Sequence, residues 1–297
     1  MSRFEDMQIY VETVERGSFS KAAEKLGLSK QYVSARIAAL EERLGIRLLN
    51  RTTRKLAPTP LGQEYFSRTR QLLQDADDAD RAVSSHAATP KGRLRLAAPM
   101  SFGLQHLPDL ISRFLQRCPE AEIDLDLNDR IVDLVSEGYD MALRLGVLPD
   151  STLIARRVAP LRQFTVASPA YLAAHGTPAT PQDLKQHACL LYGHARPVEW
   201  SYRMEGMRKT VAVEGRLRAN NGDMLCHAAQ NGLGITQLPG FIVSSAIAAG
   251  RLLPILADFE PEAGAVHVVY PCHRQQNTVV RAFSDLLYEA LNHEAGD

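Results

Sequence analysis

Apolar residues recur at helical spacing along the first part of the chain. Phe4, Met7, Val11 and Val14 are three, four and three residues apart, which places them on one face of a helix. Gly17 is placed to end that helix. The pattern predicts a first amphipathic helix that buries one stripe of side chains.

Two further amphipathic helices are predicted, joined by a tight turn at Gly27. Ser18 is placed to cap the helix 19–26, and Ser29 to cap the next one. Two short helices joined in this way are typical of a helix-turn-helix, whose second helix enters the DNA major groove. The buried stripe of that helix repeats at spacings of four, three and four and consists of Val33, Ile37, Leu40 and Leu44.

Residues 47–58 combine apolar flanks with a polar, basic centre. This pattern predicts a two-stranded wing. Its tip carries Arg51, Arg54 and Lys55, which are placed to reach phosphates or a minor groove.

A long helix is predicted from Pro60, with Thr59 as its cap. Its apolar seam repeats about every 3.5 residues, a period that favours a coiled coil between two chains. A homodimer through this helix is one interpretation, and packing of the stripe on the chain's own N-terminal domain is the other. The seam consists of Tyr65, Thr69, Leu72, Ala76, Ala79 and Val83. The polar stretch 84–90 is predicted to be a hinge.

Strand and helix patterns alternate after residue 90. Strands at 93–98, 123–127 and 139–145 alternate with helices at 104–118 and 131–137, which predicts a parallel sheet flanked by helices. The rhythm restarts after Val158, with a strand at 164–167, a helix at 169–175 and strands near 211–213 and 234–237. A strand at 266–270 and a helix at 279–291 return to the first half. Two such halves resemble a bilobed binding domain with a ligand in the cleft between them.

The distribution of charge along the chain indicates contact with phosphates. The chain has 297 residues, 45% of them hydrophobic, enough for two or three domains with buried cores. Its 34 basic and 34 acidic residues balance, but residues 1–60 hold 11 basic and 7 acidic ones, a net charge of +4. Between Leu28 and Lys55 the count is 7 to 2. Positive charge therefore gathers on the predicted helix-turn-helix and wing, as phosphate contact requires.

The sequence favours neither an enzyme nor a metal site. The four cysteines lie far apart, and Gly232-Leu233-Gly234 follows a helix and precedes a strand, the reverse of the dinucleotide-binding order. Cys272-His273 lacks a third partner. No cofactor is expected. The absence of a long apolar run and of a signal peptide's apolar core predicts a cytoplasmic protein without membrane contact.

Many of these residues resemble the signature of LysR-type transcriptional regulators. The N-terminal match consists of residues 17–23, Leu26-Gly27-Leu28-Ser29, Val33-Ser34, Ile37, Leu40-Glu41, Leu44-Gly45, Leu48-Leu49, Arg51-Thr52-Thr53-Arg54 and Thr59-Pro60-Leu61-Gly62. The C-terminal match consists of residues 140–146, 168–172, 181–190, 232–235, Leu238-Pro239 and 279–287. Tyr32 and Ala35 depart from the family pattern, so the operator preference of other members does not carry over.

The resemblance implies an α+β multidomain chain. It combines a winged helix-turn-helix at 1–59, a linker helix and hinge at 60–90, and a bilobed α/β periplasmic-binding-protein-like domain at 91–297. One lobe is expected to contain 91–161 with 267–297, and the other 162–266. The expected function is sequence-specific regulation of transcription, controlled by a small anionic or aromatic effector.

The expected partners are double-stranded DNA, the effector, and a second copy of the chain in a homodimer, with a homotetramer and RNA polymerase as further candidates. The alternative is a solute-binding protein without a regulatory role, because residues 91–297 alone resemble one.

The candidate DNA-binding residues lie at the start of the third helix and in the wing. Lys30, Gln31, Tyr32 and Ser34 follow the capping Ser29 and are expected near base edges, since Lys suits guanine and Gln suits adenine. Contacts with DNA phosphates or the minor groove are expected from Arg36, Arg51, Thr52 and Arg54.

The candidate effector residues lie where strands of the C-terminal domain end. Ser101 opens a helix, so its hydroxyl and nearby N–H groups are placed to hold an anion, with Arg144 as a second partner. The alternatives are a helix cap for Ser101 and a surface ion pair for Arg144. The family resemblance adds the end of the Arg144 strand, and the full candidate set is Ser101, Phe102, Arg144, Gly146, His194 and Asn220.

Overall fold

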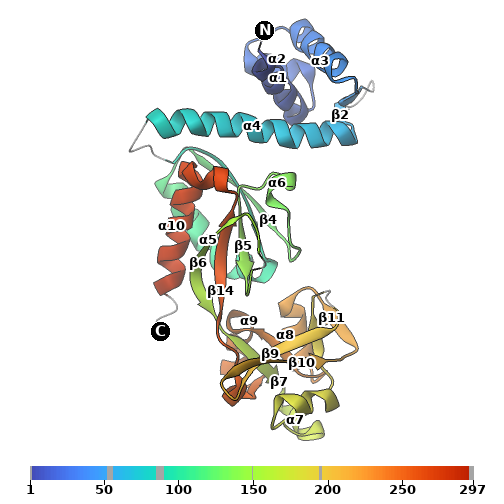
Figure 1. Ribbon diagram of the computed structural model, residues 1–297, viewed down its shortest axis with the longest axis vertical. Coiled ribbons are helices and arrows are strands. Elements are labelled where there is room, and N and C mark those ends of the chain that lie inside the picture. Colours follow the sequence, from blue (N-terminus) through green and yellow to red (C-terminus); the bar gives the residue numbers. More distant parts are fainter. Residues whose placement is uncertain (1, 52–55, 85–89, 149, 194–195, 294–297) are drawn as a thin grey trace.

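A computed structural model describes residues 2–51, 56–84, 90–148, 150–193 and 196–293 of the chain (Figure 1). It contains a helical head, a long helix beneath it and two α/β lobes in a row. Within the predicted wing tip and hinge, residues 52–55 and 85–89 lie outside the described residues. Mixed α/β content and an N-terminal helix-turn-helix confirm the predicted fold class.

Three capped helices form the head. They are α1 (Arg3–Arg16), α2 (Phe19–Leu26) and α3 (Lys30–Leu44). The hydroxyl oxygens of Ser18 and Ser29 accept hydrogen bonds from backbone N–H groups at the starts of α2 and α3, as predicted. All three helices end at glycines in the left-handed conformation, namely Gly17, Gly27 and Gly45.

The head has its own core. The stripe of α3 is buried at Val33, Ile37 and Leu40, which pack against α1, α2 and β1 (Leu49–Arg51). Strand β1 pairs antiparallel with β2 (Leu56–Pro58), which gives the predicted wing its two strands.

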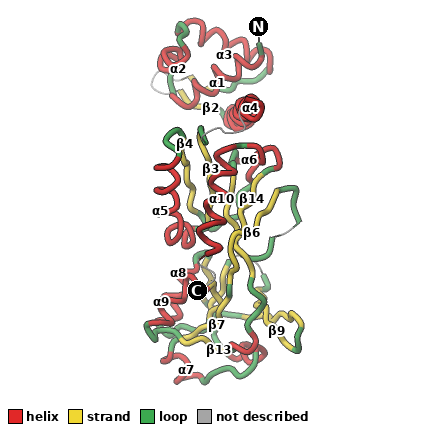
Figure 2. Tube along the Cα trace, turned by 90° about the vertical axis from the view of Figure 1, so that its left-hand side faces the viewer, coloured by secondary structure: helices red, strands yellow, loops and turns green. Residues whose placement is uncertain are grey.

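Helix α4 (Pro60–Ser84) runs between the head and the first lobe (Figures 1 and 2). The ring of Tyr65 meets the edge of Tyr10 from α1 at 5.3 Å between centroids, and Thr69 is 1% exposed. Leu72 is 53% exposed. At the first two positions of the apolar seam, Tyr65 is half-buried and Thr69 is buried within the same chain, which is the alternative interpretation of that stripe, whereas Leu72 remains accessible.

The first lobe is built on a five-stranded sheet with the order β4-β3-β5-β14-β6. Strand β3 (Gly92–Ala98) runs parallel to β4 (Ala121–Leu127) and β5 (Met141–Leu145). Strand β14 (Gly264–Tyr270) returns from the second lobe and runs antiparallel to its two neighbours, β5 and β6 (Ile154–Leu161). The predicted sheet is thus parallel only in its β4-β3-β5 part.

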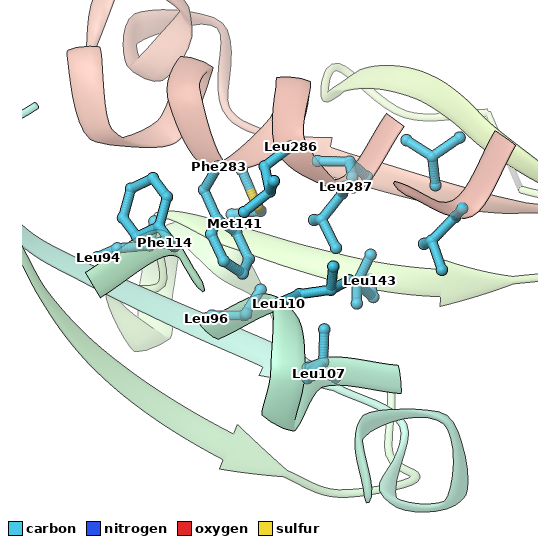
Figure 3. Packing of buried hydrophobic residues seen from close by; sticks show 14 of the residues in the cluster. Leu94, Leu96, Leu107, Leu110, Phe114, Met141, Leu143, Phe283, Leu286 and Leu287 are labelled. Carbon is cyan, nitrogen blue, oxygen red and sulfur yellow. The ribbon is translucent and has the colours of Figure 1, made fainter. Parts of the chain in front are cut away.

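Two helices cover the core of this sheet. Helix α5 (Met100–Arg117) and helix α10 (Thr278–His293) pack around the leucines of β3 and β5 (Figure 3). Between β4 and β5 lies the short helix α6 (Leu134–Glu137). The turn η3 (Cys272–Gln276) joins β14 to α10 and contacts α4.

The second lobe contains smaller sheets. Strand β7 (Gln163–Ala167) pairs antiparallel with both β12 (Thr236–Pro239) and β13 (Leu253–Ile255). Strands β8 (Leu190–Tyr192) and β11 (Leu217–Ala219) are parallel, and β9 (Val198–Met204) forms a hairpin with β10 (Met207–Val213). The remaining elements are α7 (Pro169–His175), η1 (Pro181–Gln186), α8 (Gly222–Gln230), α9 (Gly240–Ala248) and η2 (Ala257–Phe259).

The chain crosses between the lobes at two neighbouring places. One crossing joins β6 to β7, and the other leads from β13 to β14. Arg162 on the first crossing forms a two-pronged ion pair with Glu260 on the second, with both N–O distances at 2.8 Å. Such paired guanidinium–carboxylate contacts fix orientation as well as distance, so the two crossings are held together.

Candidate DNA-binding and effector sites

The first turn of α3 presents polar side chains to solvent. Lys30 and Gln31 are exposed, Ser34 is half-buried, and Ala35 one position on is exposed. The opposite face of the helix is anchored by the buried stripe, so this turn has a fixed orientation on the head. Lys30 and Gln31 are therefore available to reach DNA base edges.

Two other candidates in this turn have structural roles. The Ser29 hydroxyl accepts a hydrogen bond from the backbone N–H of Tyr32 at 3.1 Å, which satisfies an end of α3. The Tyr32 side chain is half-buried, and its hydroxyl donates to the Glu5 carboxylate of α1 at 2.9 Å. The Tyr32 hydroxyl is therefore hydrogen-bonded within the head, and its place near a base edge stays a prediction.

Arg36 also differs from its expected role. Its guanidinium forms an ion pair with Asp6 of α1, and the side chain is only 16% exposed. Arg43 approaches the other Asp6 oxygen at 3.3 Å. Because Asp6 is itself buried, this cluster ties α3 to α1 inside the head. Arg36 therefore helps to position α3, and its contact with DNA phosphates stays a prediction.

Of the candidate DNA-binding residues in the wing, only Arg51 lies within the described residues. Arg51 is the last residue of β1, where its backbone pairs with Leu56. Thr52 and Arg54 lie outside the described residues.

Ser101 lies at the contact between the two lobes. Its hydroxyl donates to the Asp223 carboxylate of α8 at 2.5 Å and accepts from the Asn221 amide at 3.2 Å. The same amide donates to Asp129 at 3.1 Å, and the other Asp129 oxygen accepts from the Met100 N–H at 2.9 Å. One hydrogen-bonded network thus joins the start of α5 to the start of α8.

This network changes the expected chemistry of the site. Ser101 does not cap its helix through its side chain, because α5 begins without a side-chain cap. Two carboxylates lie next to the hydroxyl, and Asp129 already accepts from the first N–H of α5. They disfavour an anion at Ser101 while the lobes are in this arrangement, because like charges repel.

Phe102 is buried and belongs to the same contact between the lobes. Its ring meets Phe241 of α9 edge-on at 5.4 Å and lies 4.5 Å from the ring of His106. This packing is a reason for Phe102 to be apolar that does not involve an effector.

Arg144 and Gly146 mark the end of β5. The Arg144 guanidinium donates to the carbonyl of Val132 at 2.8 Å, and burial lowers its pKa. Gly146 adopts a left-handed φ of 92° and donates its N–H to the Ala265 carbonyl at 2.9 Å. The surface ion pair considered for Arg144 is replaced by a bond to backbone.

The polar residues that the second lobe places at the contact between the lobes differ from the candidates His194 and Asn220. His194 lies outside the described residues. Asn220 is exposed, and the amide in the network between the lobes is Asn221, one position later. Tyr192, at the end of β8, lies near Asp129 of this network. Burial and the Asp129 charge raise the pKa of the Tyr192 hydroxyl to about 12.

Sequence reasoning missed Asp129, Asn221 and Asp223. The signal for the last two was the run Asn220-Asn221-Gly222-Asp223 before a helix, since Asn is a preferred helix cap. Asn221 is that cap and accepts from the Met224 N–H at 3.2 Å. Asp129 had no comparable local signal.

The other chemically suggestive motifs have structural explanations. Gly232 follows α8 with a left-handed φ of 77° and helps to close the end of that helix. His273 contacts Gln71 of α4 at 3.2 Å. Over the described ranges, no group of three or more His, Cys, Asp or Glu residues is arranged to hold a metal ion. Within the same ranges no helix is both long and apolar enough to cross a bilayer.

Comparisons with known proteins give the family. Residues 4–63 match the model of the bacterial regulatory helix-turn-helix protein of the lysR family, and residues 87–292 match the LysR substrate binding domain. The chain is 36% identical over 288 residues to the transcriptional regulator PtxR of Pseudomonas aeruginosa, covering 96% of this chain and 92% of that one.

Solved structures agree over the full length. The LysR-type regulator CrgA of Neisseria meningitidis aligns with a TM-score of 0.60 and 34% identity, covering 98% of this chain and 99% of that one. The Vibrio cholerae virulence activator AphB aligns with a TM-score of 0.59 and 27% identity, covering 97% and 99%. The attached helix-turn-helix excludes the alternative of a solute-binding protein without a regulatory role. The chain belongs to the LysR-type family: it is a DNA-binding transcriptional regulator with an effector-binding domain, and it is not an enzyme.

Proposed function

We propose that this regulator reads its operator with Lys30 and Gln31 and contacts phosphates with the wing. The exposure of both side chains in the first turn of an otherwise anchored α3 is the observation that carries this proposal. Lys30 offers donors suited to guanine, and Gln31 has the amide that pairs with adenine. The role of contacting DNA phosphates is proposed, from the sequence alone, for Arg51, Thr52 and Arg54.

Substitution at Gln31 and at Arg54 is expected to have different consequences. Gln31→Ala removes a base contact, so it should reduce discrimination between operator and mutated operator by about tenfold. Arg54→Ala removes a phosphate contact, so it should weaken binding to all sequences and reduce the slope of log K against log salt by about 1. Mobility shifts on DNA from upstream of the regulator's own gene, at several salt concentrations, measure both effects.

Arg113→Ala, an exposed arginine on α5 far along the chain, is the matched control and should leave binding unchanged. If Gln31→Ala and Arg54→Ala cause the same loss on every DNA sequence, the proposed division between base and phosphate contacts is wrong.

The effector is proposed to bind between the lobes, near Ser101 and the end of β5. The Asp129, Ser101, Asn221 and Asp223 network supports this site because it contains polar groups from both lobes. An effector donor group would replace Asn221 or oppose Asp223 at Ser101, and an effector carboxylate would find its cation in Arg144. Binding would change the contact between lobes, and with it the orientation of the head.

Removal of the Ser101 hydroxyl tests this effector site. A panel of aliphatic and aromatic carboxylic acids and amines would be screened for compounds that raise the melting temperature of the full chain. Ser101→Ala should abolish that shift for the active compound, because the variant lacks the central group of the network. Ser112→Ala, in which an exposed serine on the same helix is changed, should retain it. An unchanged shift in Ser101→Ala would refute the assignment.

Assembly and location follow from the same proposal. The exposed Leu72 and the later part of α4 are proposed to pair two chains in a homodimer, and two dimers are proposed to form a tetramer on spaced half-sites. Binding to chromosomal DNA requires a cytoplasmic location in a bacterium. RNA polymerase is proposed as the partner through which the regulator acts.

A further inference from the structure

A cavity of about 180 Å³ lies between α4 and the first lobe. Figure 2 shows α4 beside the end of the first lobe that is farther from the second lobe, whereas Ser101 lies at the contact between the two lobes. That volume is well above the roughly 10–15 Å³ that one water molecule needs. Helix α4 supplies Gln63, Phe66, Ser67, Arg70 and Gln71, and the lobe supplies Arg95, Asp124, Gly138 and Asp140.

Two arginine side chains from different elements line the cavity. Arg70 enters from α4 with its side chain 25% exposed, and Arg95 enters from β3 with 31%. Polar side chains of α4 lie between them: the Ser67 hydroxyl donates to the Gln63 carbonyl at 3.1 Å, and the Gln71 amide nitrogen lies 3.2 Å from a ring nitrogen of His273. Guanidinium groups on two sides of a small polar cavity are suited to an oxyanion, because their planar forks match phosphate and carboxylate oxygens.

The carboxylates of the wall are already engaged by basic groups. Asp124 pairs with Arg93 at 2.7 Å and more loosely with Arg95 at 3.7 Å. Arg95 also donates to the Glu137 carbonyl at 2.6 Å. Asp140 pairs with Arg274 at 2.9 Å and accepts from the backbone N–H of Arg95 at 2.7 Å. These contacts reduce the repulsion that either carboxylate would exert on an entering anion.

Positive charge accumulates around Arg70. Its ion pair with Glu15 of α1 is long, at 3.5 Å. Burial lowers the pKa of Arg70, as do the nearby charges of Arg93 and Arg95, whereas Glu15 and Asp140 act in the opposite direction. An anion between Arg70 and Arg95 would relieve this repulsion.

We propose that the cavity between α4 and the first lobe binds a small oxyanion, of the phosphate or carboxylate class, between Arg70 and Arg95. The site is separate from the cleft between the lobes and does not depend on the effector proposal. An anion held there would bond to the linker helix and to the sheet at once. It would therefore favour the arrangement in which α4 lies against the first lobe.

The test uses the full chain and two probes, inorganic phosphate and succinate, titrated by calorimetry in chloride buffer at constant ionic strength. We expect saturable binding of at least one probe. Arg70→Gln and Arg95→Gln should each weaken it by about tenfold or more, because each removes a charge-assisted hydrogen-bonding group. Arg68→Gln, on the same helix but 77% exposed, should bind with the parent affinity.

Several results would overturn the proposal. They are the absence of saturable binding of both probes, parent affinity in Arg70→Gln, or an equal loss in Arg68→Gln. Lys30→Gln separates this site from the DNA-binding surface, and a loss of probe binding in that variant would place the anion there instead. If Arg70→Gln fails to fold, Ser67→Asp provides the alternative, since it adds a negative charge to the wall and should also abolish binding.

Discussion

Gly62→Ala is expected to destabilise the head by about 3 kcal/mol, at the upper end of what overpacking costs. A Cβ atom at this position would lie 2.0 Å from the Leu48 carbonyl oxygen and 2.9 Å from the Tyr10 hydroxyl. The Leu48 oxygen belongs to backbone, and Tyr10 is buried and donates to the Gly62 carbonyl at 3.0 Å. Neither atom can move aside cheaply, so the start of α4 must separate from the head.

Thermal unfolding followed by circular dichroism measures this loss, and a mobility shift should show weaker operator binding in the same variant. Leu61→Ala changes the neighbouring residue, which is exposed, and should leave both nearly unchanged. A Gly62→Ala protein that melts and binds DNA like the parent would show that α4 does not need this close approach.

Asp140→Asn is expected to destabilise the first lobe by about 3 kcal/mol or more. Asp140 and Arg274 are both buried, the latter with a fully inaccessible side chain, and they form an ion pair at 2.9 Å. Loss of the carboxylate charge leaves the Arg274 cation in the interior without that partner. Desolvation of the cation is then no longer offset, which is why one-sided disruption of a buried pair costs more than the pair contributes.

A fall in the melting temperature of the lobe, on the order of 6–12 °C, is the expected measurement. Asp124→Asn breaks the more exposed pair with Arg93 on the same sheet edge and should change stability by no more than about 1 kcal/mol. The double variant Asp140→Leu with Arg274→Met should be more stable than Asp140→Asn. Equal effects of Asp140→Asn and Asp124→Asn would contradict this account.

The helix-turn-helix was predictable because its signals are local. The stripe of Val33, Ile37 and Leu40 lies at helical spacing, and the caps Ser18 and Ser29 act within three residues of their own positions. The wing and the alternation of strands and helices after residue 90 were likewise predictable from patterns within short stretches of sequence.

Elements whose pattern depends on tertiary pairing were harder to predict. Strand β6 was missed because Arg156 and Arg157 interrupt its apolar alternation. Its place in the sheet depends on β14, about a hundred residues later in the chain. Strand β9 and helix α9 were likewise not predicted individually.

At the DNA-binding and effector sites, too, local features were predictable and contacts between distant residues were not. Arg36 could be assigned a charge but not a partner, because Asp6 lies thirty positions away. At the cleft, the choice between Asn220 and Asn221 depends on the residue at which α8 begins. Local patterns therefore identify candidate groups, whereas contacts between distant elements decide which of them face DNA or an effector.

Strand β14 provides a direct mechanical link through the first lobe. It begins at Gly264, just beyond the crossing from the second lobe, and ends at Tyr270, next to the η3 turn that touches α4. Its seven residues span about 23 Å as extended backbone and are bonded to a strand on each side. A strand held in this way cannot bend or stretch easily. A rotation of the second lobe should therefore reach the linker helix as a displacement of its support, without unfolding any intervening segment.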